Sequence, residues 1–405
     1  MNRISRLFAL AAALTLLAGL AMASALQAAT QTRAFRQTLP PTEEEAVRLA
    51  NLAGRLEIVP GQGKEVVVEA TIHADAGSTA ETQRLLQGMK WVKSHDRKGR
   101  AEWALSYPVE KYTSYVYPTG NRNDDDHDDL PAFLGFLKDM GHTSTLYRGE
   151  RVRIYSSRHG SAPVLFANLR ITLPVGGNVA VRNAVGPVRG GDLDGTLSVD
   201  TGSGDVQIAS HSGQLAIDTG SGDVVLGSAK GETAIDTGSG DVVVKRLVGN
   251  GSVDTGSGDV VVQRISAGKL SIDTGSGDVT VQEGVAGKVV ADTGSGDVRV
   301  IAVELEDLAA DTGSGDVTVH TSLAKARRII AETGSGDISI KAGPEASFDI
   351  EADQGSGDLQ VGYDDAVLRR SGRKVVGAKR GGGRTTIHVE TGSGDCSIGP
   401  KGVEG

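Results

Sequence analysis

The sequence predicts an all-β protein whose main part is a parallel β-solenoid (β-helix). The motif Asp-Thr-Gly-Ser-Gly-Asp-Val recurs at intervals of 18 or 19 residues, and weaker copies follow at longer intervals. A fixed period of this size is typical of stacked repeats, in which each unit buries its apolar face against its neighbours. The full copies begin at Asp200, Asp218, Asp236, Asp254, Asp273, Asp292 and Asp311, and the weaker ones at Glu332, Asp353 and Glu390. We expect the copy at Glu390 to end the array.

Apolar residues alternate on both sides of each motif. Leu215 and Ile217 precede one copy, and Val224 and Leu226 follow it. A period of two indicates short strands with one buried face. We interpret the Gly-Ser-Gly between them as a corner, in which glycine adopts a positive φ at little steric cost. With the degenerate copies included, we expect about eleven coils of 18–21 residues.

The first 25 residues are typical of a secretory signal peptide. Arg3 and Arg6 precede a short, alanine-rich apolar run, and Ala23-Ser24-Ala25 offers a cleavage site. The run is too short to favour the alternative of a membrane anchor. We therefore expect an exported protein, in the periplasm or at the cell surface, with no transmembrane segment in the mature chain.

Composition excludes several classes of partner and chemistry. The net charge of −9 disfavours nucleic acid and anionic membrane. Cys396 is the single cysteine, so no intramolecular disulfide can form. It stands where the other motifs have an apolar residue, and we expect it to be a small buried hydrophobe instead of a nucleophile.

The repeats define the expected domains. Residues 30–75 contain strands that begin or cap the solenoid, 76–162 break the pattern, and 163–400 form the repeat domain with a basic loop at 363–384. In the interruption we expect a helix over 79–89 capped by Ser78 or Thr79, two strands, and a second helix over 131–140. This small α+β insertion is rich in aromatic residues, and we expect it to bind a ligand through Trp91, Trp103, Tyr112, Tyr115 and Tyr117.

The motif aspartates are candidate ligands for calcium. Gly-Ser-Gly-Asp partly resembles the calcium-binding repeat of RTX β-rolls, and stacked coils would place like carboxylates about 4.8 Å apart. Backbone N–H groups of the glycine-rich corner are the favoured counterpart, and calcium, which prefers oxygen ligands, is the alternative. No other cofactor is expected. The calcium candidates are Asp205, Asp223, Asp241, Asp259, Asp278, Asp297 and Asp316.

Catalytic interpretations are weaker. Asp-Thr-Gly-Ser resembles the active-site segment of aspartic proteases, but those enzymes need two aspartates that face each other. Repeats at a solenoid period instead stack the aspartates in a column. Polysaccharide lyases use an irregular cluster on a β-helix, whereas this array is nearly uniform. The acidic run Asp124–Asp129 is more typical of a solvated loop than of a cation site.

The strand Leu169-Arg170-Ile171-Thr172-Leu173-Pro174 and the Gly-Ser-Gly-Asp repeats after it are similar to those of the bacterial exported "putative adhesin" family. The resemblance implies a solenoid and supplies no catalytic residues. We expect a non-catalytic, adhesin-like interaction scaffold of the cell envelope, with an envelope or cell-surface protein or a glycan as partner. The alternatives are a calcium-stabilised RTX-like solenoid and a carbohydrate-active β-helix enzyme.

Overall fold

The computed structural model describes residues 30–39, 46–96, 98–118 and 142–400. Contacts divide the chain into two compact units. Of the described residues, unit 1 takes those up to Phe35 and those within Thr71–Trp91 and Ser106–Ala167, and unit 2 takes those within Arg36–Ala70 and Val92–Leu105 and from Asn168 onward. The expected signal peptide, the acidic run at 124–129 and the helix expected over 131–140 lie outside the described residues.

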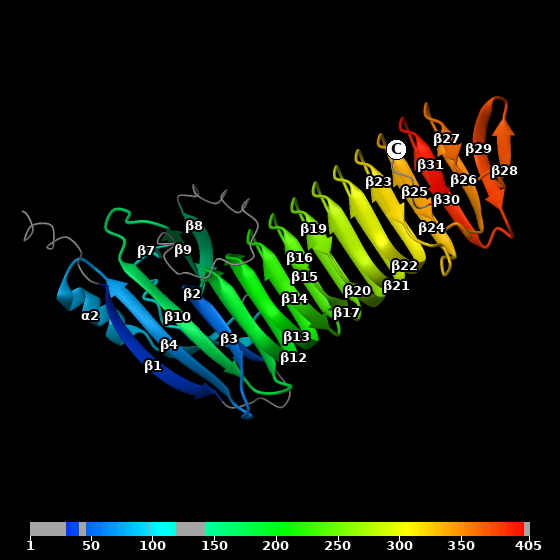
Figure 1. Ribbon diagram of the computed structural model, residues 1–405. Coiled ribbons are helices and arrows are strands. Elements are labelled where there is room, and N and C mark those ends of the chain that lie inside the picture. The colour runs from blue at the N-terminus through cyan, green and yellow to red at the C-terminus, as the bar shows by residue number, and fades with distance from the viewer. Residues whose placement is uncertain (1–29, 40–45, 97, 119–141, 401–405) are drawn as a thin grey trace, which may run out of the picture. The chain divides into compact units, whose positions relative to one another are not determined.

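Unit 2 is built mainly from parallel strands that stack coil upon coil (Figure 1). Its strands are β2 (Val47–Ala53), β3 (Leu56–Pro60), β6 (Ala101–Leu105), β11 (Asn178–Val185), β12 (Val188–Ser203), β13 (Val206–Thr219), β14 (Val224–Lys230), β15 (Thr233–Thr237), β16 (Val242–Val244), β17 (Leu247–Val248), β18 (Gly251–Thr255), β19 (Val260–Val262), β20 (Ile265–Thr274), β21 (Val279–Thr293), β22 (Val298–Thr312), β23 (Val317–His320), β24 (Arg328–Thr333), β25 (Ile338–Ala342), β26 (Phe348–Gln354), β27 (Leu359–Val361), β28 (Val367–Ser371), β29 (Lys374–Arg380), β30 (Thr385–Thr391) and β31 (Cys396–Pro400).

Every coil has the two strand arms that the alternation predicted. In most coils the first arm ends at the motif Thr, and the second begins just after the second motif Asp. Like residues pair with like from coil to coil: Ile217 lies opposite Ile235, and Val260 opposite Val279. The inward side chains of both arms are buried, and each contributes about 1.5–3 kcal/mol by leaving water. The prediction of an all-β parallel β-solenoid is confirmed.

The last coil in the sequence is not the last coil in space. β30 pairs with β24 on one side and with β26 on the other, and β31 lies between β25 and β27 (Figure 1). The prediction that the Glu390 repeat ends the array is therefore wrong. The coil formed by β26 and β27 occupies the outer position, and the chain returns to insert its final coil inside it.

The basic loop forms a hairpin beside that outer coil. β28 and β29 pair antiparallel, and β29 also pairs antiparallel with β26. The guanidinium of Arg369 contacts Asp349, and that of Arg380 contacts Asp365. The hairpin covers the free edge of β26, which would otherwise offer unpaired backbone groups to another chain.

The first coils of unit 2 are assembled from distant segments. β2 pairs with β11 and with β6, while β3 pairs with β12 and with the end of β10 (Val164–Leu173). Asn183 and Asn51 here take the place of the motif Thr, and the Asn51 Nδ2 donates to Asn183 Oδ1 at 3.0 Å. The segment around 47–58 therefore stacks in register with the coils of the solenoid.

Unit 1 contains the helix α2 (Thr79–Gly88), with β7 (Ser114–Val116), β8 (Thr143–Tyr147) and β9 (Glu150–Tyr155). The side chain of Ser78 caps α2 by accepting the Glu81 N–H, which confirms the predicted helix and cap. Leu85 and Leu86 are the apolar residues that α2 buries. Strands with residues in both units are β1 (Gln31–Leu39), β4 (Val66–Asp75), β5 (Trp91–His95) and β10 (Val164–Leu173).

Candidate functional site

The motif threonine is a structural residue. Thr274 is buried, its hydroxyl donates to the Gly258 carbonyl of the previous coil at 3.0 Å, and its Oγ1 accepts the Gly277 N–H at 3.1 Å. One side chain thus satisfies a backbone group in its own corner and another in the neighbouring coil. The same pair of bonds is made by Thr237, Thr255, Thr293, Thr312, Thr333 and Thr391.

The motif glycines allow neighbouring coils to stack closely. None of them has a φ in the left-handed range, so the expectation of positive φ at this corner was wrong. A Cβ on Gly277 would instead lie 1.9 Å from the Gly258 carbonyl oxygen of the previous coil. Only glycine leaves room for the corners to approach this closely. Positive φ occurs at another corner, for example at Gly213 and Gly231.

The second motif aspartate connects adjacent coils. The Asp259 Oδ1 accepts the Asp278 N–H at 2.8 Å, and the pattern repeats from coil to coil. The expected backbone partner is therefore present, but it belongs to the next coil and not to the residue's own corner. The acceptors in this Asp ladder are Asp205, Asp223, Asp241, Asp259, Asp278, Asp297, Asp316, Asp337 and Asp395.

The direction of the pKa shift along the Asp ladder depends on the charged groups nearby, as Asp223 and Asp278 show. Burial, together with the Asp205 carboxylate, raises the pKa of Asp223 above its ordinary value, against the hydrogen bond from the Asp241 N–H. At Asp278 burial acts in the same direction, but the Asp297 N–H and the Arg299 guanidinium outweigh it and lower the pKa. Arg299 also contacts Asp297, so a single arginine neutralises two rungs.

The first motif acid forms a second column on the outward face of the first arm. Partial burial and the flanking carboxylates of Asp218 and Asp254 raise the pKa of Asp236. The charges of this acidic column therefore repel one another. In spatial order it runs through Asp200, Asp218, Asp236, Asp254, Asp273, Asp292, Asp311, Glu332, Glu390 and Asp353.

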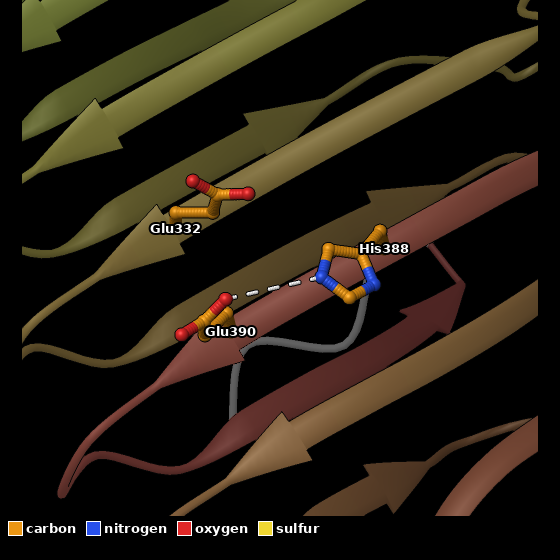
Figure 2. Close-up of side chains that lie close together, drawn as sticks. All are labelled: Glu332, His388 and Glu390. Atoms are coloured by element: carbon orange, nitrogen blue, oxygen red, sulfur yellow. Dashed lines mark ion pairs between the residues drawn. The ribbon is translucent and has the colours of Figure 1, made fainter.

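A histidine joins the acidic column where the inserted coil lies. Figure 2 shows Glu332 on β24 beside His388 and Glu390 on β30. The His388 Nε2 lies 4.0 Å from a Glu390 carboxylate oxygen, and one potential ligand atom from each of the three residues lies within 4.8 Å of the others. Within the described part of the chain, this is the one group of three or more His, Cys, Asp or Glu residues close enough to share a metal ion.

The five aromatic candidates lie in different environments. Trp91 and Tyr115 are buried, and Tyr115 packs edge-on against Tyr107. Tyr112 and Tyr117 in unit 1 and Trp103 in unit 2 are partly exposed. The Tyr112 hydroxyl donates to Glu81, whose pKa is lowered to about 2, chiefly by the hydrogen bond from Lys111 and then by Tyr112.

A charged pocket of about 360 Å³ lies in unit 2, where the acidic column begins. In its wall the Arg182 Nη2 donates to both carboxylate oxygens of Glu102, at 2.8 and 3.2 Å. Burial raises the pKa of Glu102 despite that arginine. This pocket could not be predicted from the sequence, because Glu102 lies in the irregular segment and nothing in its pattern pointed to β11.

Cys396 is buried in its strand, in register with Ile338 and Leu359. Burial, with the nearby Asp395 and Asp337, raises the pKa of its thiol to about 11. A thiol that stays protonated and covered is a poor nucleophile. It occupies the position of a small hydrophobe, as the sequence predicted.

Comparisons with known proteins give a family match for part of the chain. Residues 232–399 match the family described as Toastrack DUF4097. No curated protein matches. Among the described residues, no helix is long and apolar enough to cross a membrane.

Several solved structures are similar to this chain at low identity. One is titled a "putative lipid binding protein" from Parabacteroides distasonis (10% identity, 90% of this chain and 96% of that chain, TM-score 0.36), and another a "putative adhesin" from the same organism (12%, 90% and 97%, TM-score 0.37). A third is titled a "putative cell adhesion protein" from Clostridium sporogenes (11%, 92% and 100%, TM-score 0.16). At these TM-scores the similarity carries no argument about the function of this chain.

Proposed function

We propose that this protein is an exported, non-catalytic interaction scaffold of the cell envelope, adhesin-like in its mode of action. The observation that supports this most is the set of hydrogen bonds that the motif side chains make to the backbone. The threonine hydroxyl and one oxygen of the second aspartate are occupied by backbone groups of the same or adjacent coils, as at Thr274 and Asp259. The residues that most resemble catalytic groups thus hold the coils together.

Two surfaces are available to a partner, which we propose is an envelope or cell-surface protein or a glycan. Unit 1 presents the partly exposed rings of Tyr112 and Tyr117, and aromatic faces are common in both protein and sugar recognition. Unit 2 presents the acidic column. Each surface makes a separate prediction about which substitutions abolish binding.

The test is capture from an envelope extract and from isolated envelope glycan. The mature protein is compared with a Tyr117→Ala variant and with an Asp236→Asn, Asp254→Asn double variant. Loss of the same captured partner in one variant but not the other supports the scaffold and identifies its binding surface. No capture by the intact protein, or cleavage of an acidic polysaccharide by it, contradicts the proposal; such cleavage would favour the carbohydrate-active alternative.

A calcium-stabilised solenoid is the second candidate. It is favoured by the in-register carboxylates of the acidic column, because burial and the neighbouring charges of Asp292 and Asp254 raise the pKa of Asp273. A bound cation would relieve that repulsion. Against it, the Asp ladder already has a backbone donor at each rung from Asp205 to Asp395.

A further inference from the structure

Three residues that differ from the repeat lie close together in unit 2, namely Glu332, His388 and Glu390. The acidic column has Asp in every repeat except two, where Glu332 and Glu390 replace it. These two are far apart in the sequence, yet the insertion of β30 beside β24 puts them in register. A second outward position lies two residues before each acid of the column. From coil to coil in space, this position carries Ala309, Ile330, His388 and Glu351.

The two glutamates have only acidic neighbours along the column. Glu332 lies between Asp311 and Glu390 in the column, and Glu390 lies between Glu332 and Asp353. Residues in register with these positions are all acidic. His388 is flanked in register by Ile330 and Glu351, so no lysine or arginine occupies a register position next to the three residues.

We propose that Glu332, His388 and Glu390 bind a borderline divalent transition-metal ion, of which Zn²⁺ is the representative. Imidazole nitrogen with carboxylate oxygen is a donor set that zinc accepts, with water completing a tetrahedron. Calcium prefers an all-oxygen set of six to eight ligands. The extra methylene of glutamate over aspartate lets both carboxylates reach toward the imidazole, which explains why the repeat changes at these two positions alone.

The ion would join β24 to β30. Because β30 belongs to the coil that returns to insert between two earlier coils, the metal holds the inserted strand to its neighbour on one side. Metal that binds only the folded arrangement raises its stability by mass action. This role is independent of the proposed scaffold function, and either can fail without the other.

The test is isothermal titration of the metal-free mature protein with ZnCl₂ alone and with CaCl₂ alone. We expect one Zn²⁺ to bind and to raise the thermal unfolding midpoint. His388→Gln should weaken Zn²⁺ binding at least tenfold and reduce the midpoint shift accordingly. A Glu332→Asp, Glu390→Asp double variant, which restores the repeat residue, should also weaken binding about tenfold.

Two variants serve as matched controls. His95→Gln removes an exposed histidine elsewhere in unit 2, and Asp254→Asn removes a carboxylate from the acidic column away from His388; neither should alter Zn²⁺ affinity. All five side chains are at least partly exposed, so far-UV circular dichroism should show unchanged folding. Absence of Zn²⁺ binding, or affinity unaffected by His388→Gln, overturns the site. Binding without a midpoint shift overturns the cross-linking role.

Discussion

The Oδ1 atom of Asp259 accepts the backbone N–H of Asp278, one coil further along, at 2.8 Å. This bond turns a column of like charges into a column of coil-to-coil contacts, since each carboxylate meets a donor from its neighbour. Hydrogen bonds to ionised acceptors are about twice as strong as neutral ones. The motif therefore specifies how coils stack as well as where they turn.

Calcium should have little effect on the solenoid as a whole. Because one oxygen of each Asp in the ladder is already bonded, we expect the thermal midpoint of the mature protein to be the same in millimolar calcium and in excess EGTA. The measurement is differential scanning calorimetry in both buffers after removal of other metals. A midpoint several degrees higher in calcium would establish the calcium-stabilised alternative, and Asp259→Asn should then reduce the shift.

Replacing Thr274 with valine should destabilise unit 2. The shapes match, but the Gly277 N–H and the Gly258 carbonyl lose their partner in a buried corner. An unsatisfied buried group costs about 1–3 kcal/mol, measurable as a lower midpoint in urea unfolding. Thr280→Val, on the outward side of β21, is the control and should change the free energy of unfolding by less than about 0.5 kcal/mol. Equal effects of the two changes would contradict the structural role of the motif threonine.

A single methyl group at a motif corner should be more damaging. In Gly277→Ala the new Cβ would meet backbone at 1.9 Å, and neighbouring coils on both sides prevent relaxation. We expect a loss of about 3 kcal/mol or more. Gly382→Ala, whose Cβ would have only the Ser347 hydroxyl at 3.9 Å, should be nearly neutral. Thermal unfolding of the pair checks this, and a stable Gly277→Ala protein would show that the coils can move apart.

The repeat period and the alternation on each side of it were enough to predict the two arms, their buried faces and the solenoid. They could not predict the order of the coils. Copies that begin at Asp311, Glu332, Asp353 and Glu390 offer nearly the same edges, so each could stack on any other. The β28–β29 hairpin and its antiparallel pairing with β26 accompany the reordering. The metal candidate was missed for the same reason, since Glu332 and His388 become neighbours only through that insertion.

Neutralising one member of the acidic column should stabilise the protein at neutral pH. The raised pKa of Asp236 means that its charged form is the costly one in the folded state. Asp236→Asn should therefore increase the free energy of unfolding by about 0.5–1 kcal/mol at low salt. The gain should shrink in high salt, and it should also shrink as the pH falls toward 4, where the wild-type carboxyl becomes protonated. Asp364→Asn, outside the column, is the control, and a gain of the same size there would contradict repulsion within the column.

His211 should make the stability of unit 2 decrease in mild acid. It is buried in register with Leu193 and Ala229, and its Nε2 lies 3.2 and 3.1 Å from the Gly195 and Gln214 carbonyl oxygens. Burial lowers its pKa below the usual 6.5, although those carbonyls oppose the shift. The stabilising neutral form is complete above the unfolded-state pKa, so stability is lost as the pH falls below it, by at most about 1.4 kcal/mol per pH unit.

The substitution that tests this is His211→Leu. It costs about 1 kcal/mol at pH 7, because the two carbonyls lose their donor, but it should flatten the dependence of the unfolding free energy on pH between 7 and 5. His95→Gln removes an exposed histidine and should leave the wild-type slope in place. Urea unfolding at half-unit pH intervals separates the two, and an unchanged slope in His211→Leu would show that another group titrates in this range.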